Sequence, residues 1–374
     1  MRSPSRTVLG VGAGLAAAGV GAALGLAAER WTAGRVQGEA GGESYGSLRG
    51  TTQRVSADDG TALHVEVDEL DVDGPPDAEQ TSPVTVVFSH GFCLNQDIWH
   101  YQRQWLRGRY RMVFWDQRGH GRSATGPEQN YTVDQCGADL RAVIDAVAST
   151  GPLVLVGHSM GGMTVMALAG EYPDLIRDRV VGAALLATSS GGLADVHWGL
   201  TGSVGRVAHR IAPVAMVGLT RAPRLVDRTR RIGSDFEQLL VKRYSYASPV
   251  PSELVRFTAA MIAATPIDVV SGFLPGFDVH DKGEALAALD GIESLVLSGE
   301  DDLLTPPEHS EAIVRRMPGA EHVLVPESGH MVMLEHPDVV NLHLGDLLDR
   351  ADRAVVRAQG RGGRRPRLRR PRRA

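Results

Sequence analysis

The sequence predicts an α/β fold, in which helices cover both faces of a mostly parallel central sheet and a helical cap is inserted. Two observations predict it. Short apolar runs typical of buried strands alternate with segments of helical spacing along most of the chain. This alternation stops between residues 191 and 282, where irregular helical segments with scattered arginines replace it. We therefore expect a core formed by residues 51–190 and 283–350, with the cap at 191–282.

The first part of the core is predicted to hold a hairpin, a helix and four buried strands. The hairpin pairs Arg54–Ala57 with Ala62–Val67 around a turn that contains Asp-Gly. Thr132 is a candidate N-cap for the helix, in which apolar residues recur at helical spacing from Leu140 to Val147. The runs that predict the buried strands are Val84–Phe88, Tyr110–Trp115, Leu153–Val156 and Val180–Leu186.

The alternation of strands and helices returns after the cap. A strand at Ser294–Leu297 is followed by a helix at Glu308–Met317, a strand at His322–Val325 and a helix at Met331–Leu348. Because strands that alternate with helices pair in parallel, both halves of the core are expected to contribute to one sheet.

Composition narrows the possible classes of protein. The length of 374 residues allows one large domain with an insertion, or two domains. Only two cysteines are present, Cys93 and Cys136, too few for a disulfide framework, and their neighbours indicate no metal site. We expect neither a metal nor another cofactor. The net charge of −5 does not identify a partner, and the sequence leaves the oligomeric state open.

The N-terminal segment carries an uncharged run of 21 residues from Val8 to Ala28. As a helix it would span about 30 Å, the thickness of a bilayer's hydrocarbon core. Residues 1–30 are therefore interpreted as a membrane anchor, a cleaved export signal or a soluble arm, joined to the core by a Gly-rich linker at 31–50. The first two interpretations predict a membrane-anchored or exported protein rather than a cytoplasmic one.

The C-terminal segment, residues 351–374, is strongly basic. From Arg353 onward it holds ten arginines and no acid, with many glycines and prolines near its end. This composition predicts a disordered tail. The tail could attract anionic lipid or nucleic acid, or simply be solvated. Because no aromatic residue interrupts the arginines, a specific nucleic-acid role is not expected.

Ser159 lies in Gly157-His158-Ser159-Met160-Gly161-Gly162, directly after a predicted buried strand and before an apolar helix. This context makes the G-x-S-x-G pattern informative, because the glycines allow a sharp turn that exposes the serine hydroxyl. The alternative is a Gly-rich turn that only packs a helix on a sheet.

A serine hydroxyl needs a base to remove its proton, and the base needs an acid to orient it. His330 follows the strand that ends at Val325, and the strand at Ser294–Leu297 leads into a loop with Asp301 and Asp302. All three groups follow strands, so they would lie at the same edge of a parallel sheet. The sequence therefore predicts a triad of serine, aspartate and histidine in that chain order.

Five motifs together resemble the α/β-hydrolase fold family, most closely its microbial esterase, lipase and cofactor-free haloperoxidase branches. They are GHSMGG, HGF at 90–92, DQRGHGRS at 116–123, GEDDLLTP at 299–306 and SGHMVMLEHP at 328–337. The resemblance spans roughly residues 50–350, without the cap. It implies that Ser159 is the nucleophile, His330 the base and then the acid, and Asp302 the orienting carboxylate, with Asp301 as the alternative.

An oxyanion formed at the substrate carbonyl needs preorganised donors. The backbone N–H groups of Met160 and Phe92 are the expected donors, since one follows the nucleophile and the other follows His90-Gly91 at the end of an early strand. His90 is expected to brace this loop, and the 116–123 loop to be structural.

These residues predict a serine hydrolase that cleaves a small-molecule carboxylic ester through an acyl-enzyme intermediate. A serine at position 159 speaks against epoxide hydrolases and haloalkane dehalogenases, whose nucleophile is a carboxylate. GHSMGG also resembles monoacylglycerol lipases, which together with the candidate anchor makes a lipid-like ester one option. The alternatives are a perhydrolase or haloperoxidase, a C–C bond hydrolase with the same triad, and a ligand-binding protein with a vestigial triad.

Overall fold

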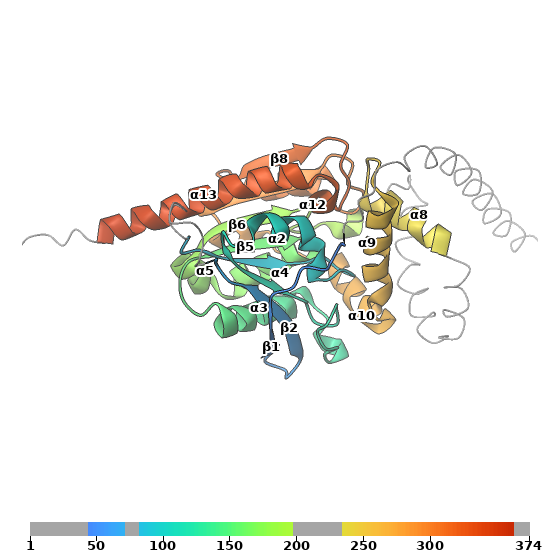
Figure 1. The fold of residues 1–374 in the computed structure, drawn as a ribbon, viewed down its shortest axis with the longest axis horizontal. Helices are drawn as coiled ribbons and strands as arrows, with labels where there is room; N and C mark the ends of the chain where they lie inside the picture. The colour runs from blue at the N-terminus through green and yellow to red at the C-terminus, as the bar shows by residue number, and fades with distance from the viewer. Residues whose placement is uncertain (1–43, 72–81, 197–233, 363–374) are drawn as a thin grey trace, which may run out of the picture. The chain divides into compact units, whose positions relative to one another are not determined.

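The computed structural model describes residues 44–71, 82–196 and 234–362, drawn in colour in Figure 1. The described residues from Tyr45 onward form one compact unit. The candidate anchor or signal at 8–28 lies outside the described residues, as do positions 31–43 of the expected linker.

The described residues form one eight-stranded sheet with the order β1-β2-β4-β3-β5-β6-β7-β8. β2 runs antiparallel to both of its neighbours, and every other pair in the sheet is parallel. The predicted mostly parallel sheet is thus confirmed. The strands are β1 (Thr51–Ser56), β2 (Ala62–Asp68), β3 (Thr85–Ser89), β4 (Arg111–Trp115), β5 (Leu153–His158), β6 (Val180–Leu186), β7 (Glu293–Gly299) and β8 (Glu321–Val325).

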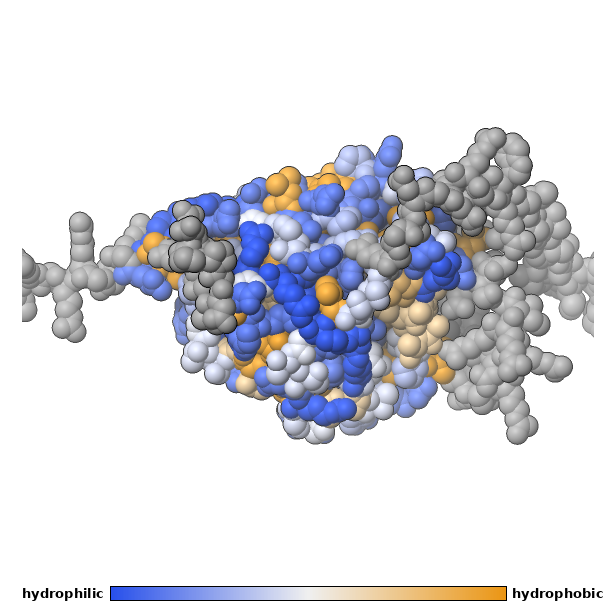
Figure 2. Space-filling model, viewed as in Figure 1, coloured by the Kyte–Doolittle hydropathy of each residue, from blue (hydrophilic) through white to orange (hydrophobic). Residues whose placement is uncertain are grey.

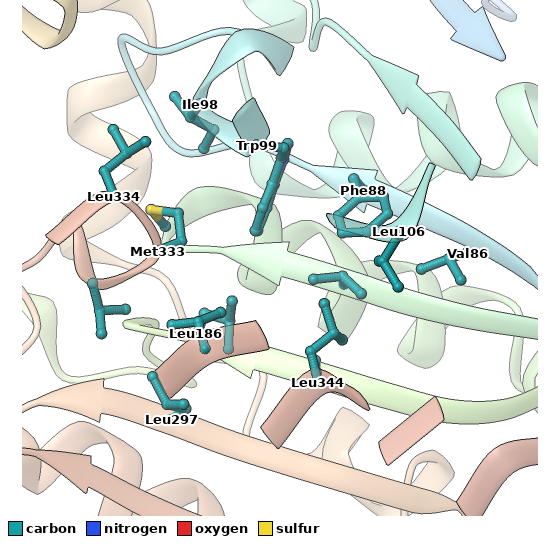
Figure 3. Close-up of a cluster of buried hydrophobic side chains, with 14 of the residues drawn as sticks. Val86, Phe88, Ile98, Trp99, Leu106, Leu186, Leu297, Met333, Leu334 and Leu344 are labelled. Atoms are coloured by element: carbon teal, nitrogen blue, oxygen red, sulfur yellow. The ribbon is translucent and has the colours of Figure 1, made fainter. Parts of the chain in front are cut away.

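Side chains of the central strands alternate between two apolar cores, one on each face of the sheet. In β3, Phe88 faces one core and Val87 the other. The helices on the Phe88 side are α2 (His100–Leu106), α12 (Val332–Glu335) and α13 (Pro337–Gly362). Figure 3 shows this core, where Trp99, Leu106 and Leu344 gather over the strands. The opposite core is covered by α3 (Val133–Val147), α4 (Met160–Glu171), α5 (Pro173–Arg179) and α11 (Pro307–Arg316).

The predicted N-cap of α3 is confirmed, because the Thr132 side chain accepts a hydrogen bond from the backbone N–H of Gln135 at 3.1 Å. The helix expected at Met331–Leu348 is instead two helices, α12 and α13. His336, with φ −129° and ψ 61°, separates them directly before Pro337. A residue that precedes proline is disfavoured in the helical conformation, which explains the break.

The C-terminal segment differs from the expected disordered tail over residues 351–362, which continue α13. Ala351 and Val355 are buried against the core, one helical turn apart, and this packing outweighs the basic composition. Residues 363–374 lie outside the described part of the chain.

The described part of the cap contains α8 (Ser234–Ser245), α9 (Ser252–Ala264) and α10 (Ile267–Asp278), which Figure 1 shows grouped together. Its two chain ends lie side by side, because Gly191 and Asp281 form an antiparallel bridge and the N–H of Lys282 donates to the carbonyl of Ser190 at 2.7 Å. Figure 2 shows weakly apolar side chains over α9 and α10. Cap residues 197–233 lie outside the described ranges.

Among the described residues, no single helix has the length and hydropathy of a membrane span. The pair α9 and α10, bent by 92° at a short break, meets those criteria only when the two helices are taken together.

Candidate active site

Ser159 occupies the turn between β5 and α4 in an uncommon backbone conformation, with φ 52° and ψ −120°. Such a conformation costs of order 1–3 kcal/mol and must be held by its surroundings. Close packing holds it here. A Cβ on Gly157 would lie 2.5 Å from the carbonyl oxygen of Gly161, and one on Gly161 would lie 2.1 Å from that of Ser89. Glycine is therefore required at both positions, as the sequence pattern predicts.

His330 and Asp302 come together at the carboxyl edge of the sheet, in the loops after β8 and β7. The Nδ1 atom of His330 lies 2.8 Å from Oδ2 of Asp302, and both side chains are buried. Asp301 is exposed to solvent. Of the two neighbouring aspartates, the structure thus places Asp302 beside the imidazole.

Three donors fix the Asp302 carboxylate. Its Oδ1 accepts the backbone N–H groups of Leu304 at 2.8 Å and Thr305 at 3.0 Å, and its Oδ2 accepts the Thr305 hydroxyl at 2.8 Å. Since a carboxylate only accepts hydrogen bonds, the contact with Nδ1 assigns the ring proton of neutral His330 to that atom. Nε2 is then free to accept a proton.

Ser159 and His330 line the same cavity, which has a volume of about 290 Å³. Met160 and Phe92 also line this cavity, and Asp302 lies behind His330. All five site residues predicted from the sequence therefore lie at one end of the sheet. Within the described residues, the backbone N–H groups of Met160 and Phe92 donate to no acceptor. Met160 is the first residue of α4, where an N–H group has no partner inside the helix and the helix dipole favours negative charge.

Loop 116–123 and His90 hold the Phe92 loop in place. The Nε2 atom of His90 accepts the backbone N–H of Gln117 at 2.9 Å, and its Nδ1 donates to the carbonyl of Gly91 at 2.7 Å. Burial, with a smaller contribution from His120, lowers the pKa of His90 to about 3, so its ring is neutral. Thr164 of α4 donates to the Gln117 side chain at 2.7 Å and so joins this loop to the helix after Ser159.

Sequence reasoning gave no role to His158, although the residue is part of the quoted GHSMGG motif. It is the last residue of β5 and fully buried, and its Nε2 lies 3.0 Å from the backbone carbonyl oxygen of His330. The centroids of the two imidazole rings are 4.8 Å apart. Burial holds the pKa of His158 well below its ordinary value, so the neutral ring donates its Nε2 proton to that carbonyl. The only signal in the sequence was its place beside Ser159.

Within the described ranges, no group of three or more His, Cys, Asp or Glu side chains is arranged to hold a metal ion.

Known proteins share both the sequence pattern and the fold. The family model described as alpha/beta hydrolase fold matches residues 84–337. A protein of Caulobacter sp. (strain K31) named as a carbamate hydrolase is 27% identical over 269 residues, which cover 69% of this chain and 87% of the relative. The 2-hydroxy-6-oxo-6-(2'-aminophenyl)hexa-2,4-dienoic acid hydrolase of Metapseudomonas resinovorans is 26% identical over 281 residues, or 74% of this chain and 87% of the relative.

Among solved structures, a thermophilic esterase from Thermogutta terrifontis superposes with a TM-score of 0.62 and 22% sequence identity. The match covers 81% of this chain and 99% of the esterase. At this level of identity the likeness concerns the fold.

Proposed function

Because the chain belongs to the α/β-hydrolase fold family, we propose that it is a serine hydrolase that cleaves carboxylic esters through an acyl-enzyme intermediate. One observation carries the proposal. The Nδ1 atom of His330 lies 2.8 Å from a fully buried Asp302, while Ser159 and His330 face the same cavity. This arrangement has the parts needed to activate a hydroxyl nucleophile.

In acylation, the Oγ atom of Ser159 attacks the ester carbonyl carbon while Nε2 of His330 takes the hydroxyl proton. The carbonyl oxygen becomes an oxyanion and accepts hydrogen bonds from the N–H groups of Met160 and Phe92. The C–O bond to the alcohol then breaks, and the imidazolium gives its proton to the departing oxygen. Asp302 stabilises the imidazolium through Nδ1 while this charge exists.

In deacylation, a water molecule gives a proton to Nε2 of His330 and attacks the acyl carbon. The second oxyanion uses the same two N–H donors, and its collapse returns the proton to Ser159 and releases the acid. Each half-reaction begins and ends with neutral His330, so the cycle needs no external proton carrier.

Two other enzymatic activities would use the same residues. In a perhydrolase, hydrogen peroxide would replace water as the nucleophile in deacylation and release a peracid. In a C–C bond hydrolase, the bond broken would join two carbons, and the similarity to a hexadienoic acid hydrolase supports this alternative. To distinguish a perhydrolase from an ester hydrolase, peracid formation and ester hydrolysis are measured in the same sample.

We also propose that residues 8–28 attach the protein to a membrane or direct its export, on the strength of their uncharged length. Fractionation of the full chain and of a variant lacking residues 1–30 tests this. An anchor predicts that only the full chain stays in the membrane pellet after an alkaline wash.

The test of the proposed activity is labelling of the full chain with a fluorophosphonate probe, alongside a series of 4-nitrophenyl esters of increasing acyl length. We expect Ser159 to be labelled, and Ser159→Ala to lose both labelling and ester hydrolysis. A wild-type protein that hydrolyses no ester and takes up no probe would support the ligand-binding alternative.

A further inference from the structure

The cavity beside Ser159 has an apolar wall built by several parts of the chain. Phe92 comes from the loop after β3, Met163 from α4 and Leu193 from the start of the cap, while Ile262, Leu274 and Phe277 come from α9 and α10. Figure 1 shows that these two helices lie together beside the core. An apolar substrate group bound against this wall exchanges contact with water for dispersion contacts.

Of the lining hydroxyl groups other than Ser159, those of Thr258 and Thr305 are hydrogen-bonded to protein partners, and that of Ser245 is the third. The hydroxyl of Thr258 lies 2.6 Å from that of Tyr246 and shares one hydrogen bond with it. Thr305 donates to Asp302 at 2.8 Å. Hydroxyl groups in this wall thus offer few hydrogen bonds to a charged group on the substrate.

No lysine or arginine lines the cavity among the residues that the structure describes. Among the described lining residues, the ionisable side chains are His330, already assigned to proton transfer, and Asp278 at the exposed end of α10. A carboxylate that entered the cavity would lose hydration against this apolar wall, and none of the described lining residues offers it a Lys or Arg partner, which is unfavourable.

We propose that this site selects esters that are uncharged and apolar around the scissile bond, and that it discriminates against substrates that carry a carboxylate. The inference rests on the proposed hydrolase function. It also separates the chain from its relative that hydrolyses a hexadienoic acid, since that protein's substrate is itself a carboxylic acid.

The test compares two esters that differ in one charge and one methyl group. Mono(4-nitrophenyl) adipate carries a terminal carboxylate, and its methyl ester has the same acyl chain and the same leaving group with no charge. We expect the wild-type full chain to hydrolyse the methyl ester with a kcat/KM at least about tenfold higher. Equal or faster hydrolysis of the carboxylate would overturn the inference.

A variant pair ties the preference to the cavity wall. Ile262→Lys introduces a cation from α9, and Ile262→Met introduces an uncharged chain of similar length. We expect Ile262→Lys to raise the ratio of kcat/KM for the carboxylate over the methyl ester several-fold, whereas Ile262→Met leaves that ratio near the wild-type value. Equal ratios in both folded variants would contradict the assignment to this wall.

A wrong function and a wrong substrate class give different experimental results. If the proposed function is wrong, neither ester is hydrolysed and the fluorophosphonate does not label Ser159. If only the substrate class is wrong, labelling and hydrolysis persist but the charge preference is absent. Thermal unfolding of both Ile262 variants checks that they fold. If either variant does not fold, the comparison of the two esters with the wild-type protein still tests the inference.

Discussion

The imidazole of His158 donates from Nε2 to the backbone carbonyl oxygen of His330, over 3.0 Å. This bond joins β5, which ends beside Ser159, to the loop that carries the proposed base. His158 therefore fixes the separation between two groups that come from distant parts of the sequence, and it does so without facing the substrate. We regard it as a positioning residue.

Replacement of His158 by phenylalanine is expected to lower kcat by about tenfold or more. The buried carbonyl of His330 would lose its donor, a loss worth about 1–3 kcal/mol, and the base would be free to shift. The measurement is kcat per active site, with sites counted by fluorophosphonate titration. His158→Gln keeps an N–H donor and should recover part of the rate. A purely structural role would instead reduce the number of titratable sites and leave kcat per site unchanged.

Asp302→Asn is expected to lower kcat by about 10³–10⁴-fold with little change in fold. The amide is nearly the same size, but it cannot stabilise an imidazolium and it favours the wrong ring tautomer of His330. Asp301→Asn is the matched control, because it changes the adjacent and exposed aspartate in the same way. A larger loss in the Asp301 variant would contradict the assignment. Steady-state rates with one 4-nitrophenyl ester are sufficient.

Gly161→Ala should abolish the labelling of Ser159 and destabilise the protein. The added Cβ would lie 2.1 Å from the carbonyl oxygen of Ser89, so the turn must move, at a cost of about 1–3 kcal/mol. Gly276→Ala in α10 is the control, since its added Cβ meets no described atom within 4 Å beyond its chain neighbours and the adjacent helix backbone. It should be neutral or stabilise by up to about 1 kcal/mol. Urea unfolding and probe labelling report the two effects separately.

Stability should fall in mild acid partly because of His90. Its folded-state pKa is lowered by burial to about 3, whereas in the unfolded chain the imidazole takes up a proton near its ordinary value of 6.5. The unfolded state therefore binds more protons between these values. The stabilising contribution is complete above pH 6.5 and is lost as the pH falls toward 3.

The variant His90→Gln isolates this contribution. The slope of the unfolding free energy against pH, measured by urea unfolding between pH 6.5 and 4.5, should be shallower by up to about 1.4 kcal/mol per pH unit. Asp116, whose pKa burial raises to about 6, acts in the opposite direction in both proteins and cancels in the comparison. Identical slopes would show that His90 does not titrate in this way.

Most of the fold and the site residues could be predicted because their signals are local. The glycines around Ser159 indicate a tight turn in which larger residues would clash. The apolar runs before Asp302 and His330 indicate strands that end at the same edge of the sheet. The role of His158 was not predictable in this way. That role depends on the tertiary arrangement, which places the end of β5 beside the loop after β8. No residue near position 158 indicates this arrangement in the sequence.

The C-terminal helices show two different failures of sequence reasoning. The break before Pro337 could have been predicted, since the residue before a proline resists helical geometry. The continuation of α13 through 351–362 was hidden by its arginines, which dominate the composition while Ala351 and Val355 supply the buried contacts. Composition describes the average of a segment, whereas packing depends on a few of its positions.

Because Gly191 and Asp281 pair at the base of the cap, the chain departs from the core and rejoins it at one point. The insertion therefore constrains the strands no more than a short loop at the same position would. An insertion attached in this way can vary in sequence and size while the core stays the same. The substrate preference of such a protein can therefore change without a change in its reactive groups.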